Sequence, residues 1–274
     1  MWGVKTNLLL ISSLLLLPFN CTPSSEVEDE HAFDYLNGTG KGPERWGEIN
    51  PEWRICDNGN MQSPIDLLNH RVEIMPHLGR LHRKYKPDHA FVMNRGHDIM
   101  LKWKRGAGSI IINGIHYTLK QCHWHSPSEH TFNGSRYHME LHMVHENNEG
   151  KLAVVGITYK FGRPDPFLQK IIPHVMPIET TELGAEIDAG IINPRDIKIG
   201  SRKYYRYIGS LTVPPCSEGV IWTLVKKVRT VSREQVRILR EAVHDGCEEN
   251  ARPVQPQDGR TVLLYTPTGT PGSR

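Results

Sequence analysis

The chain has 274 residues, 38% of them hydrophobic, with 33 basic and 30 acidic residues spread along its length. This near balance of charge, without a basic cluster, excludes a nucleic-acid-binding footprint and indicates an ordinary solvated surface. The length fits one large β domain or two small domains.

The first 25 residues are typical of a secretory signal peptide. One basic residue precedes the apolar run 8–17, and a proline with small or polar residues follows it. The run is shorter than the roughly 20 residues that span a bilayer, and no later stretch is apolar enough to do so. We therefore expect a signal peptide at 1–25, a mature chain at 26–274 with its core at about 33–265, and no membrane span after cleavage.

Strand patterns dominate the middle of the chain. Two apolar runs within 109–119 flank Asn113 and Gly114, a pair that predicts a hairpin because both residues tolerate positive φ. Stretches rich in β-branched or aromatic residues predict further strands at 97–104, 151–161 and 220–228.

Helix signals are few. Asp165 and Pro166 predict a helix start, and Pro173 is expected to bend or stop that helix after residue 172. Ser232 and Gln235 form a capping box for a helix that runs to about residue 244. Its buried stripe is expected to be Val236, Leu239 and Val243. With no internal repeat and no Pro-, Gly- or Ser-rich linker, the pattern favours a single, mainly β domain with short helices.

Histidines are concentrated between residues 121 and 146, which hold six of the fifteen. Side chains alternate along a strand, so His123 and His125 share one face. Asn133 and Gly134 predict a tight turn, after which residues 136–145 can return antiparallel with Glu140 and His142 on one face. Three imidazoles with an open fourth position are the donor set of a catalytic zinc site.

The spacing leaves the third ligand open among several histidines. His130, His138 and His145 are rivals of His142, and His138 has the same parity. We expect His138 not to share the metal with His142, because four residues along a strand span about 13 Å.

With four other motifs, this segment resembles the α-class carbonic anhydrases, particularly the plant-type members. The similarity runs from about residue 33 to 255. The other motifs are GNMQSPID at 59–66, NRGH at 94–97, LTVPPC at 211–216 and RPVQP at 252–256. The resemblance implies a central twisted, largely antiparallel sheet and reversible, zinc-dependent hydration of carbon dioxide to bicarbonate and a proton.

The resemblance also implies roles for individual residues. His123, His125 and His142 would bind Zn²⁺, whose bound hydroxide attacks carbon dioxide, and Gln121 and Glu140 would orient the ligands. Thr212 would accept the hydrogen bond of the hydroxide and pass its own proton to Glu129, and His97 would carry protons to solvent. The expected apolar wall of the substrate pocket is Val144, Val154, Leu211, Val213 and Trp222. Val213 replaces a threonine common in animal members.

Cysteines and sequons support export. The four cysteines beyond the signal region allow three ways of making two bridges, and the resemblance selects Cys56–Cys216. Cys122 is expected to be a core thiol, and Cys247 has no assigned role. Asn37 and Asn133 begin glycosylation sequons, which matter only in an exported chain. The expected location is extracellular, through the secretory pathway, with the plastid stroma as the alternative in a plant; the oligomeric state is open.

The predicted function is that of a lyase whose partners are the small molecules carbon dioxide and bicarbonate. Two other functions are rivals of this prediction. A non-catalytic or storage protein with the same fold would typically lack one or more of the metal histidines, and here all three are present. An ester hydrolase could use the same zinc hydroxide. A serine mechanism is disfavoured, because the sequence has no G-x-S-x-G motif.

Overall fold

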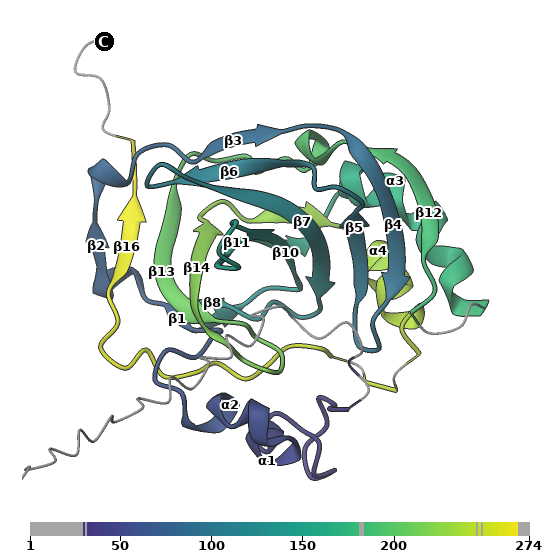
Figure 1. Ribbon diagram of the computed structural model, residues 1–274, viewed down its shortest axis with the longest axis horizontal. Helices are drawn as coiled ribbons and strands as arrows, with labels where there is room; N and C mark the ends of the chain where they lie inside the picture. Colours follow the sequence, from purple (N-terminus) through teal and green to yellow (C-terminus); the bar gives the residue numbers. More distant parts are fainter. Residues whose placement is uncertain (1–29, 31, 181–183, 245, 248, 268–274) are drawn as a thin grey trace, which may run out of the picture.

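The computed structural model describes residues 30, 32–180, 184–244, 246–247 and 249–267, so the expected signal peptide lies outside the described residues. Figure 1 shows a strongly twisted sheet, with α3 (Pro166–Val175) and α4 (Arg233–Glu241) beside the strands β4 (Asp88–Asn94) and β12 (Ile187–Ile192). The short helices α1 (Trp46–Ile49) and α2 (Ile55–Asn58) lie together below the sheet in this view. Within the described part of the chain, no helix is long and apolar enough to cross a membrane.

Strands make up most of the regular structure. They are β1 Asp66–Leu67, β2 Val72–Ile74, β3 His82–Tyr85, β4 Asp88–Asn94, β5 Ile99–Trp103, β6 Gly108–Ile112, β7 Ile115–His125, β8 Thr131–Phe132, β9 Ser135–Arg136, β10 Met139–Glu146, β11 Leu152–Phe161, β12 Ile187–Ile192, β13 Tyr204–Ser210, β14 Glu218–Val225, β15 Arg229–Val231 and β16 Val262–Tyr265. Short 3-10 turns lie at Pro51–Trp53, Asn69–Arg71, Pro76–Leu78, Met176–Thr180 and Pro194–Asp196.

Thirteen of these strands form one sheet with the order β12-β4-β5-β7-β10-β11-β14-β13-β16-β2. Off this path, β6 pairs with both β3 and β7, and β15 pairs with β11. The pairs β11–β14, β11–β15 and β16–β2 are parallel, and the other pairs of the large sheet are antiparallel. The predicted mainly β, largely antiparallel architecture is therefore confirmed.

Both predicted Asn-Gly turns are present, with positive φ at each residue. Asn113 (φ 51°) and Gly114 (φ 80°) join β6 to β7, and Asn133 (φ 50°) and Gly134 (φ 77°) join β8 to β9. The sequence suggested that the second turn joins the two histidine strands directly. This prediction was wrong, because the turn joins β8 to β9. Asp66 accepts hydrogen bonds from the Gly134 backbone and holds the short hairpin against β1, in a separate three-stranded sheet. Strands β7 and β10 still pair antiparallel.

The two predicted helices exist with different ends. Helix α3 continues past Pro173 to Val175, because the proline ring lies on the exposed side while Ile172 and Val175 stay in the core. The capping box of Ser232 and Gln235 starts α4 as expected, but the helix ends at Glu241, short of the predicted residue 244. The expected stripe of Val236, Leu239 and Val243 is buried.

Strand alternation gives the central strands two different faces. Cys122, Leu141 and Val155 face the large hydrophobic cluster that includes the buried side chains of α3 and α4. The neighbours of these residues along the strands point to the opposite face, where Val144 and Val154 belong to a second cluster. This second face is the one that carries the predicted metal histidines.

Candidate metal centre

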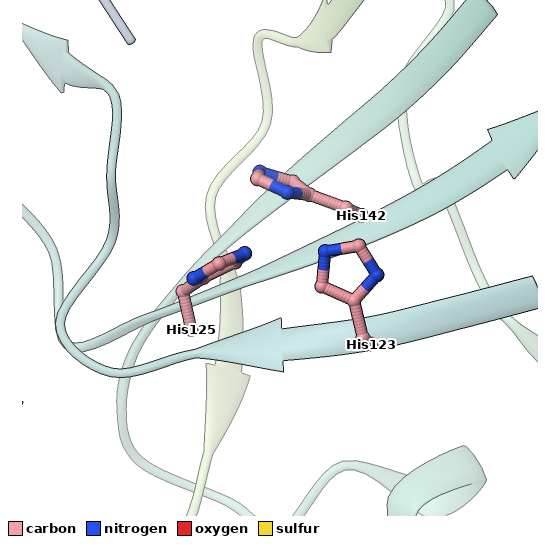
Figure 2. A group of neighbouring side chains, drawn as sticks. All are labelled: His123, His125 and His142. Atoms are coloured by element: carbon pink, nitrogen blue, oxygen red, sulfur yellow. The ribbon is translucent and has the colours of Figure 1, made fainter. Parts of the chain in front are cut away.

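Three histidines converge from two adjacent strands. His123 and His125 alternate with Trp124 on β7, and the register places His142 of β10 directly opposite His123. Figure 2 shows the three rings gathered on one side of these strands. One ligand atom from each histidine lies within 4.8 Å of the others, and the side chains are buried. Alternation along β7 and the pairing register of β7 with β10 together bring these residues to one point.

The His123 ring is oriented by its neighbour two positions earlier. Nδ1 of His123 lies 2.9 Å from Oε1 of Gln121, which has no proton on that oxygen and must accept. The other ring nitrogen, Nε2, is left with its lone pair. Burial, followed by the charge of Arg95, holds the pKa of His123 well below its ordinary value. The ring is therefore neutral at physiological pH, as a metal ligand must be.

His125 is oriented by a backbone group that the sequence did not reveal. Its Nδ1 donates to the carbonyl oxygen of Asn250 at 2.7 Å, and the Asn250 side chain accepts from the Ser126 backbone at 2.7 Å. Burial lowers the pKa of His125, but the carboxylates of Glu129 and Asp98 outweigh it and raise that pKa overall. A backbone carbonyl 125 positions away carries no residue-type signal, so sequence patterns could not predict it.

Glu140 orients His142 and also binds a second histidine. Its Oε1 lies 3.0 Å from Nε2 of His142 and 2.8 Å from Nδ1 of His130. Burial alone would raise the pKa of Glu140, but the charge and hydrogen bonds of His130 and His142 hold it well below its usual range. Nε2 of His130 lies 2.7 Å from the Tyr207 hydroxyl oxygen. The same oxygen lies 2.8 Å from Oγ of Ser63.

The unsatisfied atoms of the site fit a cation. Nε2 of His125 and Oε2 of Glu129 are buried and have no hydrogen-bond partner among the described residues. Oε2 of Glu129 lies 3.6 Å from that nitrogen and 3.9 Å from Nδ1 of His142. Unpartnered buried polar atoms are costly, and a divalent ion held by three imidazole nitrogens beside a carboxylate would satisfy them.

The rival third ligands have other partners in the structure. His130 belongs to a second group with Glu140 and His142 whose ligand atoms also lie close together, but these atoms hydrogen-bond one another. His145 bonds the Tyr85 hydroxyl at 2.8 Å and the Ala153 carbonyl at 3.1 Å. His138 is exposed and packs on a phenylalanine, Phe161. The geometry favours His142 as the third member of the set.

The three other predicted catalytic residues are all buried, and one of them, Glu129, lies beside the metal histidines. Oε1 of Glu129 accepts from the Arg252 backbone at 3.0 Å, and its other oxygen faces the ligand nitrogens. Thr212 is buried in the loop after β13. His97, expected at a solvent-facing mouth, is only 6% exposed, and its Nε2 lies 2.6 Å from the Phe33 carbonyl oxygen.

Four of the five expected pocket-wall residues belong to one cluster. Val144, Val154, Leu211 and Trp222 are buried together, and the Trp222 ring lies 4.8 Å from that of His142 between centroids. Val213 instead packs in the N-terminal cluster with Phe33, Trp46 and Trp53. Side-chain alternation predicts only which face of the sheet a strand residue points to. It could not predict the packing of Val213, which lies in a loop.

The predicted disulfide is confirmed. Cys56 in α2 and Cys216 after β13 are bonded, with Cα atoms 5.1 Å apart, and the bridge encloses a sequence separation of 160. Cys122 and Cys247 are buried and form no disulfide bond. The sequon residues Asn37 and Asn133 are both exposed.

Comparison with known proteins identifies strong similarities along almost the whole chain. The family model described as eukaryotic-type carbonic anhydrase matches residues 41–266. Alpha carbonic anhydrase 7 of Arabidopsis thaliana is 56% identical over 260 residues, which cover 94% of this chain and 94% of that protein.

Solved structures show the same fold. A dioscorin complexed with ascorbate superposes with a TM-score of 0.84 at 43% identity, covering 87% of this chain and 99% of that one. An α-carbonic anhydrase from Thermovibrio ammonificans, in complex with the inhibitor sulfanilamide, has a TM-score of 0.77 at 38% identity, with coverages of 84% and 98%.

Proposed function

Because the chain belongs to the eukaryotic-type carbonic anhydrase family, we propose that it catalyses the zinc-dependent, reversible hydration of carbon dioxide to bicarbonate and a proton. One observation carries the proposal. Three imidazole nitrogens lie within 4.8 Å of one another, while the opposite nitrogen of each ring is hydrogen-bonded to a fixed oxygen acceptor. This arrangement presents three lone pairs to one point.

The chain's own residues define how a zinc ion would be held. Nε2 of His123, Nε2 of His125 and Nδ1 of His142 are the ring nitrogens opposite those that make the orienting bonds. Neutral imidazoles leave the full charge of the ion uncompensated, unlike thiolates or carboxylates. When bound, zinc supplies the Lewis acidity that makes hydroxide available for attack on carbon dioxide near neutral pH, as is general for this class of enzyme.

Thr212 and Glu129 are proposed to orient the attacking group. The carboxylate oxygen Oε2 of Glu129 is buried without a hydrogen-bond partner among the described residues, so it can accept the Thr212 hydroxyl proton. The threonine oxygen would then be fixed as an acceptor toward the nucleophile. Val144, Leu211 and Trp222 supply an apolar surface next to the metal histidines, which suits an uncharged, apolar substrate.

His97 is proposed to move protons between the site and solvent. An imidazole with an ordinary pKa near neutrality suits this task. In this structure the ring packs against Phe33 and Tyr35, with centroid distances of 5.2 and 5.4 Å. Proton exchange with solvent therefore requires the ring or the N-terminal segment above it to move. A His97→Ala variant should lose turnover in dilute buffer and regain it as imidazole buffer is raised.

A stopped-flow hydration assay with metal analysis tests the proposal. We expect the purified protein to hydrate carbon dioxide, to lose this activity in a zinc chelator and to regain it when zinc is restored. His125→Ala should remove both zinc and activity. His138→Ala is the matched control and should keep both, because this histidine is exposed and lies on Phe161.

The same preparation separates the rival functions. Zinc-loaded, folded protein without chelator-sensitive hydration would contradict the proposal and favour a binding or storage role. Hydrolysis of an ester substrate that greatly exceeds hydration would favour a zinc esterase.

We also propose that the chain is exported, with signal cleavage near residue 25 and sugars at Asn37 and Asn133. The disulfide supports an oxidising compartment. Asn133 uses Oδ1 to accept from the Asn69 backbone at 2.9 Å, which leaves its amide nitrogen available for a sugar. N-terminal sequencing and glycosidase treatment of the secreted protein test this. An uncleaved or plastid-retained product would contradict export.

A further inference from the structure

A cleft of about 430 Å³ lies away from the metal centre. It is lined by residues of β13, β14 and β16 and by Ile112 and Asn113 at the β6–β7 turn. Arg206 and Ile208 alternate along β13 with Tyr205 and Tyr207, which belong to the cluster on the metal side of the sheet. The cleft therefore lies mainly on the opposite face, although Tyr207 is also one of its lining residues. Its volume is in the range of clefts that bind small organic ligands.

Arg206 is a buried cation at this cleft with little compensation from the protein. Its side chain is 8% exposed, and its Nε donates to the Thr223 hydroxyl at 3.0 Å. The guanidinium also lies over the Tyr204 ring, 5.2 Å from its centroid. Among the described residues, no carboxylate forms an ion pair with it and no acceptor binds its two Nη groups. The two Nη groups are not among the fully buried atoms without a partner, so they remain accessible at the cleft and can donate to a bound anion.

The rest of the lining defines the other half of the ligand. Leu78, Ile112, Ile208, Ile221 and Leu263 form apolar walls, and none of the lining residues is acidic. Ile208 is 42% exposed, which is unusual for so large an apolar side chain on a central strand of the sheet.

Arg260, the second cation of the cleft, is already engaged. Its Nε and Nη2 groups donate to the carbonyl oxygens of Gln257, Gln62 and Pro256 at 2.6–2.9 Å. Arg260 therefore adds positive electrostatic potential to the cleft, but its donors are already used by these carbonyl groups. Arg206 is the cation that can pair directly with an anion.

We propose that this cleft binds an organic monocarboxylate with an apolar body, whose carboxylate pairs with Arg206 and whose body covers Ile208 and Ile221. The planar guanidinium matches a carboxylate with two parallel hydrogen bonds. A single free guanidinium among apolar walls neutralises one negative charge, which disfavours phosphate dianions. The site is separate from the proposed chemistry, so it holds whether or not the chain hydrates carbon dioxide.

Isoleucine-methyl NMR of the purified mature protein tests the site with octanoate as probe. Octanoate should shift the signals of Ile112, Ile208 and Ile221 saturably, and leave that of Ile65, in the metal-side cluster, unchanged. Octanol at equal concentration should bind at least tenfold more weakly, because it lacks the charge. If octanoate moves none of the cleft methyls, or binds no better than octanol, the proposal is wrong.

Variants then assign the charge. Arg206→Gln should weaken octanoate binding at least tenfold, whereas Arg136→Gln, an exposed arginine on β9, should leave it unchanged. Should Arg206→Gln fail to fold, Ile208→Glu provides the second test, since it places a carboxylate at the exposed edge and should abolish binding. Ile191→Glu, at another exposed isoleucine, on β12, is its control. Unchanged affinity in a folded Arg206→Gln or Ile208→Glu protein would refute the assignment.

Discussion

Replacement of Gly156 by alanine should weaken metal binding through Glu140. Gly156 on β11 lies in register with His142 of β10. A Cβ atom added there would overlap Cδ1 of the buried Leu224 and lie only 3.1 Å from Oε1 of Glu140. That oxygen is the acceptor shared by His142 and His130.

The size of the effect has two parts. Overpacking against Leu224 should cost about 1–3 kcal/mol of unfolding free energy. Displacement of an orienting partner typically lowers metal affinity by about 10- to 100-fold. We therefore expect both losses in Gly156→Ala, measured by denaturant unfolding of the metal-free protein and by competition for zinc with a chromophoric chelator.

Two variants separate the effect on Glu140 from general overpacking. Gly162→Ala, directly after the same strand, places its Cβ 3.0 Å from the Thr230 methyl and should change stability without changing zinc affinity. Adding Leu224→Ala to Gly156→Ala should restore part of the affinity by giving the methyl room. Gly156→Ala protein that is destabilised but binds zinc as tightly as the parent would refute the inferred dependence on Glu140.

Three further outcomes follow from the structure. Serine at both Cys56 and Cys216 should lower the unfolding free energy by about 5 kcal/mol, from the loop entropy of a 160-residue separation, as measured by denaturant titration; a loss under about 1 kcal/mol would contradict this. Burial lowers the pKa of His145 from 6.5 to about 4. Between these pH values the unfolded chain binds a proton at this residue that the folded chain does not. The free energy of unfolding should therefore fall as the pH drops from about 6.5 to 4, by up to about 3 kcal/mol. His145→Asn should flatten that pH dependence of unfolding, and an unchanged slope would exclude the explanation. His138→Ala should retain its zinc, and a metal-free product would overturn the exclusion of this residue as a ligand.

Local patterns predicted the parts of the molecule that depend on near neighbours in sequence. Strand alternation put His123 and His125 on one face, and both Asn-Gly turns formed with the expected positive φ. The third histidine needed the pairing register of β7 and β10, which alternation alone does not determine. Only this register places His142 opposite His123.

Long-range contacts account for most of what could not be predicted. The partner of His125 is a backbone carbonyl, at Asn250, and any residue type can offer one. The cover over His97 comes from the segment around Phe33, whose packing depends on the N-terminal aromatic cluster. Tertiary packing also lets α3 continue beyond Pro173, where a local rule predicted a bend or a stop.

For an ionised Glu140 and two neutral imidazoles, the hydrogen bonds behind His142 allow one arrangement of protons. An ionised Glu140 brings no proton, so both imidazole nitrogens that face it must carry one. His130 then accepts from the Tyr207 hydroxyl, and Tyr207 accepts from Ser63, whose own oxygen receives the Ser210 amide. The tautomer of His142, and with it the lone pair offered to a cation, is therefore set by Glu140, and the same carboxylate connects the metal centre through His130 and Tyr207 to the loop before β1.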